Sequence, residues 1–188
     1  MIGRLRGALV SSGESVVVDV SGVGYEAQVT PKDLASLPKV GEEMTLHVHT
    51  HVREDEISLY GFVEESDREL FRVLLTASGV GPKVAMAMLA SLKADEIVRA
   101  IVSEDPDALT VTPGVGKRGA QKIVLELAPK LAGREVEIAG GAGLTAVRRA
   151  LEGLGYSVAE INSAVVGVNP QDLIEDQVKA ALQSLGSR

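Results

Sequence analysis

The chain has 188 residues, 45% of them hydrophobic and 3% aromatic, which suffices for about one large domain or two to three small ones. Its formal net charge of −7 argues against a simple nucleic-acid coat, and the absence of cysteine excludes disulfide bonds, thiolate metal sites and cysteine nucleophiles. The opening "MIGRLRGALV" is too polar for a signal peptide and no stretch approaches about 18 apolar residues, so we expect a cytoplasmic protein without membrane contact.

Residues 1–63 are predicted to form a small antiparallel barrel. The segments "SVVVDV" and "YEAQVT" flank "SGVG", a hairpin signal, and "REDE" turns into a further strand, "ISLYGFV". In "EMTLHVHTHV" apolar and polar residues alternate, as in a strand with two different faces. About five or six short strands in some sixty residues favour a barrel of the oligonucleotide-binding (OB) type.

All three histidines of the chain, His47, His49 and His51, fall on one face of that strand. Imidazole is a common zinc ligand, so a metal site is one interpretation. No acid or cysteine nearby obviously completes it, and a solvated or interface face is the preferred interpretation. Histidines confined to one strand also give no basis for a Ser-His-Asp set. We therefore expect no metal, no cofactor and no catalytic residues.

Residues 64–131 are predicted to be helical. The first helix, "ESDRELFRVLLTA", carries one apolar stripe and has Ser66 as its candidate N-cap. Residues 64–134 hold 10 of the 19 basic residues, whereas the flanking segments are net acidic. Solvated surface charge would also explain that distribution. Four more helices are predicted at "PKVAMAMLASL", "KADEIVRAIVSE", "DPDALTV" and "GKRGAQKIVLELAPKL".

A glycine hairpin occurs twice in this helical segment. "ASGVGPKVAMAM" and "TPGVGKRGAQKI" align at a spacing of 35 residues, with Gly79 on Gly114 and Gly81 on Gly116. Glycine permits left-handed backbone angles and removes the Cβ that would block a ligand, and the N–H groups at a helix N-terminus favour an anion. The intervening valine can anchor the turn. Two such elements can hold phosphates of a duplex backbone without reading bases.

Other interpretations of the hairpins remain open. Gly114, Gly116 and Gly119 match the dinucleotide pattern G-x-G-x-x-G, but that pattern follows a strand, and here the preceding segment is helix-like. A P-loop needs glycine and Ser or Thr where the chain has Val111 and Arg118. A pair of packing corners between helices is the plain structural alternative.

Residues 132–144, "AGREVEIAGGAGL", lose periodicity and gather glycine, which is typical of a linker. Residues 145–188 then show three helical patterns, "TAVRRALEGL", "SVAEINSAVVG" and "PQDLIEDQVKAALQSL". A three-helix bundle of this size is near the lower limit for independent folding. The predicted fold class is therefore α+β with several domains.

The chain resembles the RuvA family of Holliday-junction-binding proteins over essentially its whole length. The resemblance rests on "MIGRLRG", "GVGYE", "VREDE" with "LYGF", "GVGPK" and "PGVGK", which together are very specific. It implies an OB-fold barrel, tandem helix–hairpin–helix motifs and a mobile, UBA-like three-helix domain. It also implies a homotetramer on a four-way junction, with one or two tetramers per junction both open. The implied partners are the RuvB ATPase, bound by the third domain, and as a further candidate a junction resolvase.

The resemblance also assigns residues. An acidic pin falls on Glu54 and Asp55, and whether Glu56 belongs to it stays open; alone, this run is typical of a solvated turn. The motor-binding surface is not assigned by the resemblance; it is expected at apolar residues of the tail left over after packing, around Leu154, Tyr156 and Val158. The expected DNA-binding residues are Gly79, Val80, Gly81, Lys83, Gly114, Val115, Gly116, Lys117, Arg118 and Lys122.

The leading hypothesis from these observations is a junction-binding subunit that recruits an ATPase for branch migration in recombination and repair, with no activity of its own. A structure-specific nuclease that uses the "REDE" carboxylates and the same hairpins is the alternative. A protein–protein adaptor that binds no DNA is a third.

Overall fold

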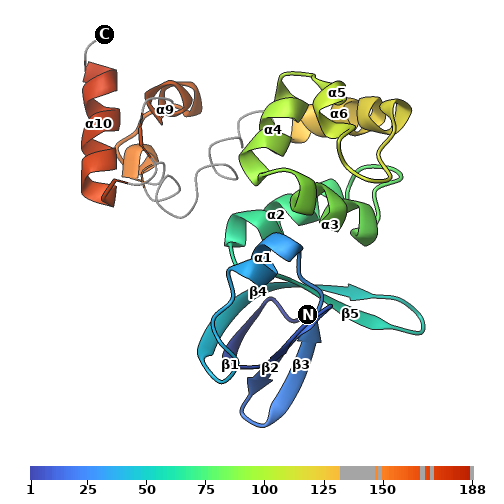
Figure 1. Ribbon diagram of the computed structural model, residues 1–188. Helices are drawn as coiled ribbons and strands as arrows, with labels where there is room; N and C mark the ends of the chain where they lie inside the picture. Colours follow the sequence, from blue (N-terminus) through green and yellow to red (C-terminus); the bar gives the residue numbers. More distant parts are fainter. Residues whose placement is uncertain (132–146, 148–149, 166–167, 170–171, 187–188) are drawn as a thin grey trace.

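The computed structural model describes residues 1–131, 147, 150–165, 168–169 and 172–186 (Figure 1). The N-terminal part is a curled antiparallel sheet of 5 strands in the order β3-β2-β1-β4-β5. The strands are β1 (Arg4–Ser12), β2 (Val16–Val20), β3 (Val23–Ala27), β4 (Glu43–Val52) and β5 (Ile57–Phe62). The hairpin pairings of β2 with β3 and of β4 with β5 are those that the turn signals in the sequence predicted. The central strand, β1, pairs with β2 on one side and with β4 on the other.

The sheet curls until its two edges meet at Gln28. The Gln28 N–H donates to the Leu59 carbonyl at 2.8 Å, and the Gly61 N–H donates to the Gln28 carbonyl at 2.8 Å. This short parallel bridge joins the end of β3 to β5 and gives the barrel its closed side. Leu46 and Val48 are buried inside it, as their alternation along β4 predicted.

The middle part is entirely helical and packs around its own core. Its helices are α2 (Glu65–Leu74), α3 (Pro82–Ser91), α4 (Ala94–Val102), α5 (Pro106–Leu109) and α6 (Lys117–Leu131). The change from strand to helix falls where the periodicity changes, but the predicted N-cap was wrong. Glu64 takes the N-cap position of α2 without a side-chain cap, and Ser66 lies inside the first turn.

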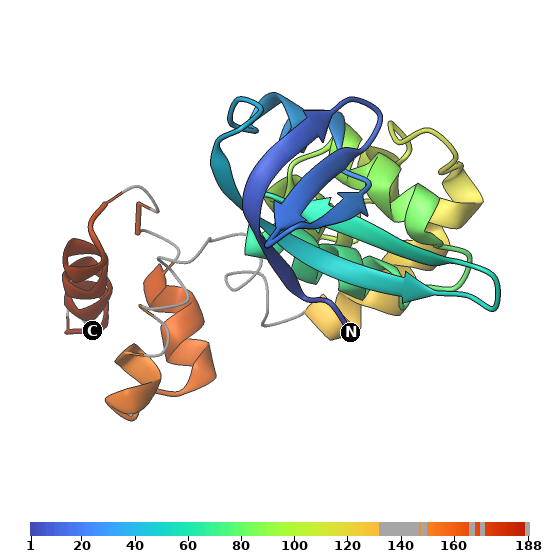
Figure 2. The same ribbon diagram turned by 90° about the horizontal axis from the view of Figure 1, so that it is seen from below.

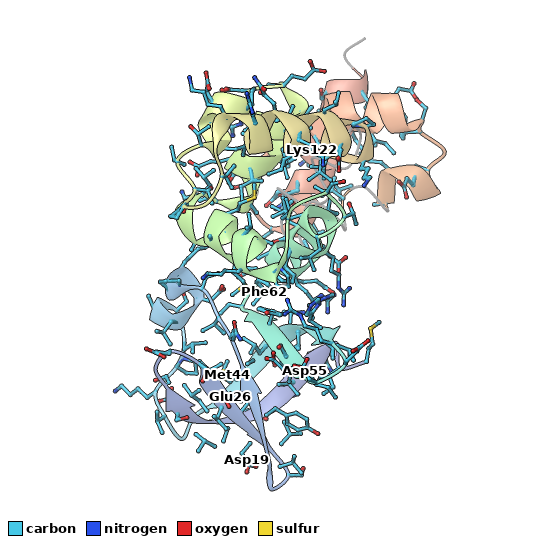
Figure 3. The ribbon with its side chains drawn as sticks, turned by 90° about the vertical axis from the view of Figure 1, so that its right-hand side faces the viewer. Asp19, Glu26, Met44, Asp55, Phe62 and Lys122 are labelled. Carbon is cyan, nitrogen blue, oxygen red and sulfur yellow. The ribbon has the colours of Figure 1, made fainter. Side chains whose placement is uncertain are left out.

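The barrel has an apolar core of its own, and the core of the helical part extends onto the end of β5, so the two parts share this second core where they meet. Phe62 at the end of β5 and Phe71 on α2 are both fully buried, with ring centroids 5.1 Å apart. Their cluster extends from Tyr60 in the barrel to Leu131 at the end of α6. In Figure 3, Phe62 lies where the sheet meets the helices. The two parts therefore cannot turn against each other without exposing this core.

Polar contacts also hold the barrel and the helical part together. Two of them come from α1 (Pro31–Ala35), the short helix beside the barrel. The buried Asp33 carboxylate accepts the Val63 N–H at 3.0 Å, just before α2 begins. Lys32 Nζ lies 3.0 Å from the nearly buried carboxylate of Asp67. Arg68 Nη1 donates to the carbonyl of Gly3 at 2.8 Å. Because these contacts hold α2 and the residues just before it from both α1 and the start of the chain, they fix the direction of α2.

The C-terminal part forms a third, separate core. Residues 150–153 are helical, and α9 (Val158–Val165) and α10 (Ile174–Gly186) follow, in agreement with the three predicted helices. Val147, Leu151, Ile161, Ala164 and Ala181 are buried together. The predicted linker at 132–144 lies outside the described residues. Across the described chain, the structure contains no helix with the length and apolar character of a membrane span.

The three histidines lie on the face of β4 that meets α2, so the interface interpretation of this face is confirmed. The His49 ring meets the edge of Phe71, with centroids 5.4 Å apart, and the His51 ring meets Tyr60 at 6.3 Å. Burial lowers the pKa of His47, and burial together with the Arg72 guanidinium lowers the pKa of His49. Among the described residues no group of three or more His, Cys, Asp or Glu is placed to hold a metal ion.

These lowered pKa values predict a loss of stability in mild acid. The unfolded chain binds protons at His47 and His49 more readily than the folded one, so stability is complete well above the unfolded pKa of about 6.5 and falls as the pH drops through it toward the folded pKa. We expect the free energy of unfolding to decrease between about pH 7.5 and 5.5 in the natural protein. The decrease should be smaller with His47→Gln and His49→Gln combined. Denaturant titrations across this range measure both, and parallel pH profiles would refute the assignment.

Candidate nucleic-acid interface

The two glycine hairpins have the same backbone structure. Each begins as a helix ends, turns at a glycine, and enters the next helix one residue after the second glycine, so α2 leads to α3 and α5 leads to α6. Three backbone hydrogen bonds recur at the spacing of 35 residues. These are Ala77 to Leu74 and Thr112 to Leu109, Val80 to Ala77 and Val115 to Thr112, and Ala85 to Gly81 and Ala120 to Gly116.

The first glycine of each hairpin is required by the backbone. Gly79 has φ +84° and Gly114 has φ +87°, in the left-handed region that glycine occupies without strain. The second glycine is different. Gly81 has an ordinary φ of −91°, and a Cβ at Gly81 or Gly116 would meet no heavy atom within 4 Å. The fold itself therefore does not require glycine there, whereas a ligand that approaches the backbone closely would.

The valines between the glycines point into the core. Val80 is 7% exposed and Val115 is 6% exposed, and both belong to the same apolar cluster as the surrounding helices. Their side chains anchor the turns, as expected from the sequence. Any contact of these two predicted DNA-binding residues with a ligand must therefore come from the backbone.

The start of each following helix is positive and open to solvent. Lys83 on α3, and Lys117 with Arg118 on α6, are exposed. Gly81, the N-cap of α3, has no side chain to cap the first N–H groups. The helix dipole adds partial positive charge at the same end. Each hairpin thus combines open N–H groups, a flat glycine surface and a cation, which suits a phosphate.

Lys122, one turn further along α6, is exposed but not a free cation. Its Nζ lies 3.8 Å from Glu126 Oε1. Glu126 was not among the residues predicted from the sequence, although Lys122, Glu126 and Lys130 follow each other at i, i+4 and i+8. That spacing places all three on one face of α6.

The β4–β5 hairpin carries the acidic residues at its tip. The Arg53 N–H donates to the Glu56 carbonyl at 2.8 Å, which leaves Glu54 and Asp55 as the two central residues of an exposed turn. Figure 3 shows Asp55 at this tip, and Figure 1 shows the tip on the same side of the molecule as both glycine turns. The hairpin extends well past the rest of the sheet (Figure 2).

Glu56 faces a different environment from its two neighbours. Its carboxylate accepts the Ser58 hydroxyl at 2.6 Å, back along β5. Glu56, Arg53 and Lys83 line one shallow cleft of about 440 Å³ between the barrel and α3. This cleft runs between the residues that flank the tip of the β4–β5 hairpin and the start of α3, directly after the first glycine hairpin. The Glu56 carboxylate is thus tied to Ser58 on β5, whereas Glu54 and Asp55 occupy the two central positions of the turn.

Comparison with known proteins gives matches over all three parts. Family models match residues 1–61 (RuvA N terminal domain), 71–129 (SAM-like Helix-hairpin-helix tandem) and 146–186 (RuvA, C-terminal domain). A relative from Pseudomonas syringae is 42% identical over 99% of this chain and all of its own length. One from Rubrobacter xylanophilus is 41% identical over the full length of both. Both are named "Holliday junction branch migration complex subunit RuvA".

The two glycines of one hairpin should respond differently to substitution. Gly79→Ala should lower the free energy of unfolding by about 1 kcal/mol, because alanine is strained at positive φ. Gly81→Ser should leave stability unchanged or raise it, since serine is a good N-cap. It should nevertheless weaken DNA binding, because the new side chain fills the space where a phosphate would approach. Denaturant unfolding and fluorescence anisotropy measure the two effects. Unchanged DNA affinity in Gly81→Ser would show that no ligand comes close to this glycine.

Proposed function

Because the chain belongs to the RuvA family, we propose that it is the junction-binding subunit of a branch migration complex. It binds four-way DNA by shape and by phosphate contacts, and it holds the junction open for a partner ATPase of the RuvB type. It has no catalytic activity of its own and acts in the cytoplasm during recombination and repair. The observation that carries this proposal is the pair of glycine hairpins with one backbone structure, in a chain that matches relatives of this name from end to end.

The hairpins supply the attraction. One hairpin binds one phosphate, and two held rigidly in the same helical core contact two phosphates of one duplex arm. Such contacts do not depend on the base sequence, so the protein recognises the positions of the phosphates along the DNA backbone. A sequence-independent subunit is what a migrating junction requires, because the sequence at the crossover changes at every step.

The acidic tip supplies the selectivity. In a homotetramer with four-fold symmetry, the tips of four β4–β5 hairpins would come together near the axis and place eight carboxylates there, two from each chain. Over a Debye length of about 10 Å they would repel phosphates at the centre while the hairpins hold the arms further out. This arrangement favours an open, square junction. Glu54 and Asp55 would form the pin, and Glu56 would not.

The third domain would bind the motor. Of the predicted docking residues, Leu154 is 62% exposed, whereas Tyr156 packs against the core of the domain. The side chain of Val158 is not among the side chains that the structure describes. Leu173, at 76% exposure, and Ile174, at 50%, are further apolar residues on the surface of this domain. Exposed apolar side chains of this kind suit a protein partner. A junction resolvase, on the other hand, would have to reach the DNA held by the first two domains.

Removal of the hairpin lysines should weaken DNA binding and its salt dependence together. With Lys83→Ala and Lys117→Ala combined, each lost phosphate contact should reduce the slope of log K against log salt by about 0.9. Affinity should fall alike for all sequences. The matched control is Lys39→Ala, which removes an exposed lysine from the barrel. Anisotropy titrations at several salt concentrations measure the slope. A slope equal to that of the natural protein would mean that these lysines do not touch DNA.

Neutralisation of the pin should have the opposite effect. Glu54→Gln with Asp55→Asn removes two charges per chain from an exposed turn, so folding should be nearly unaffected. Binding should tighten, and more for linear duplex than for a junction, because duplex is no longer excluded from the centre. The control is Asp19→Asn with Glu26→Gln, two acids that lie on β2 and β3 of the barrel and not on the β4–β5 hairpin; Figure 3 labels both together with Asp55. Unchanged affinity for both DNA forms would leave Glu54 and Asp55 as ordinary solvated residues. Loss of a Mg²⁺-dependent cleavage activity would instead support the nuclease alternative.

A further inference from the structure

The two hairpins differ at the residue before the first glycine. The first has Ser78 there, and the second has Pro113. Proline locks its own φ and has no N–H, so the second loop is stiff and leaves no donor to satisfy at this position. Serine provides neither property. A loop with the same backbone structure therefore needs another source of rigidity in the first copy.

Side chains from α6 supply that rigidity. Glu126 Oε2 accepts the backbone N–H of Ser78 at 2.7 Å. One turn later, Lys130 Nζ donates to the Thr76 hydroxyl at 2.9 Å and to the Thr76 carbonyl at 3.3 Å. The hydrogen bonds from Ser78 also lower the pKa of Glu126, because they favour its ionised form. The loop of the first hairpin is thus held from outside by two groups of a helix that starts at the second.

We propose that Glu126 is a positioning residue for DNA binding, which fixes the first hairpin at a set distance from the second. The inference rests on the proposed function, because the hairpins are taken as the phosphate sites. Glu126 need not touch DNA. Since α6 carries Lys117 at its first residue and Glu126 two and a half turns later, one rigid helix spans both sites. The spacing of two phosphate contacts is then set by the length of a helix and not by a flexible loop.

The charge of Glu126 makes this inference sharply testable. A carboxylate beside Lys122 and the first basic hairpin repels DNA and partly neutralises a cation that could bind phosphate. If Glu126 were only a surface charge, its removal would tighten DNA binding. If it positions the hairpin, its removal weakens binding in spite of the gain in positive charge. The two roles therefore predict changes of opposite sign.

The first experiment compares Glu126→Ala and Glu126→Gln by junction anisotropy at fixed salt. Glu126→Ala should weaken binding about five- to tenfold, in the range expected for the net loss of one ordinary, solvent-exposed hydrogen bond. Glu126→Gln keeps an acceptor for the Ser78 N–H and should bind at least as well as the natural protein. The matched control is Asp95→Ala on α4, which removes a carboxylate from a similar i, i+4 pair with Arg99 at 3.5 Å but contacts no hairpin. It should bind like the natural protein.

The second experiment introduces into the first hairpin the proline that the second hairpin has at the equivalent position. Ser78→Pro combined with Glu126→Ala removes the donor and the acceptor together and restores stiffness in the way that Pro113 does. Junction affinity should return to within about twofold of the natural value, a rescue that a general loss of folding would not show. Hydrogen exchange of the Ser78 amide should be faster in Glu126→Ala than in the natural protein or in Glu126→Gln.

Two results would overturn the inference: tighter or unchanged binding in Glu126→Ala, or no recovery in the double variant. Failure of the proposed function would look different. In that case the natural protein itself would not bind the junction, or the combined Lys83→Ala and Lys117→Ala variant would bind as well as the natural protein.

Discussion

The packed contact between the end of β5 and α2 is the constraint on which the rest of the structure depends. Phe62 and Phe71 lie fully buried in it, and the Asp33 carboxylate and the Arg68 guanidinium tie the surrounding backbone together. An acidic tip on the barrel and basic hairpins on the helices discriminate DNA shapes only if their separation is fixed. A flexible tether would let the hairpins bind any duplex while the tip moved aside. The shared core removes that freedom.

Placement of charge explains how a net acidic chain can bind a polyanion. The formal net charge is −7, yet the exposed lysines and arginine at the helix starts lie beside open backbone N–H groups. The acids at the tip of the β4–β5 hairpin belong to a different element and face solvent. Screening by salt limits the range of each charged group to about 10 Å. A phosphate therefore responds to the charges near it and not to the net charge of the chain. Attraction at the hairpins and repulsion at the tip can then coexist in one chain.

Local patterns in the sequence predicted a large part of this architecture. Alternation along β4 predicted the buried Leu46 and Val48, and the repeat of 35 residues predicted two hairpins with one structure. Those features depend on residues close together in the sequence, so they can be predicted from the sequence alone. The N-cap of α2 was wrong by two residues, because Ser66 looked like a capping residue and the end of the barrel decides where this helix starts. Continuity of the core across residue 63 was not visible either, since it arises from contacts between β5 and α2.

The hydrogen bond from Ser78 to Glu126 illustrates the same limit, since it joins residues 48 positions apart. Sequence periodicity places Glu126 on a helix face but does not tell which loop that face meets. The difference between Ser78 and Pro113 is visible in the sequence repeat. Only the structure shows that Ser78 donates a hydrogen bond to Glu126. A repeat compared position by position is therefore most informative where its copies differ, provided that the tertiary contacts of each copy are known.

The most direct test of a rigid clamp for four-way DNA is a competition experiment at one salt concentration. Labelled four-way junction is bound by the full-length protein, and unlabelled junction or linear duplex of the same sequence and length is added as competitor. If fixed hairpins and a fixed acidic tip select the open junction, the junction should compete far better than the duplex. Equal competition by the two DNA forms would contradict that selection, even if both bound tightly.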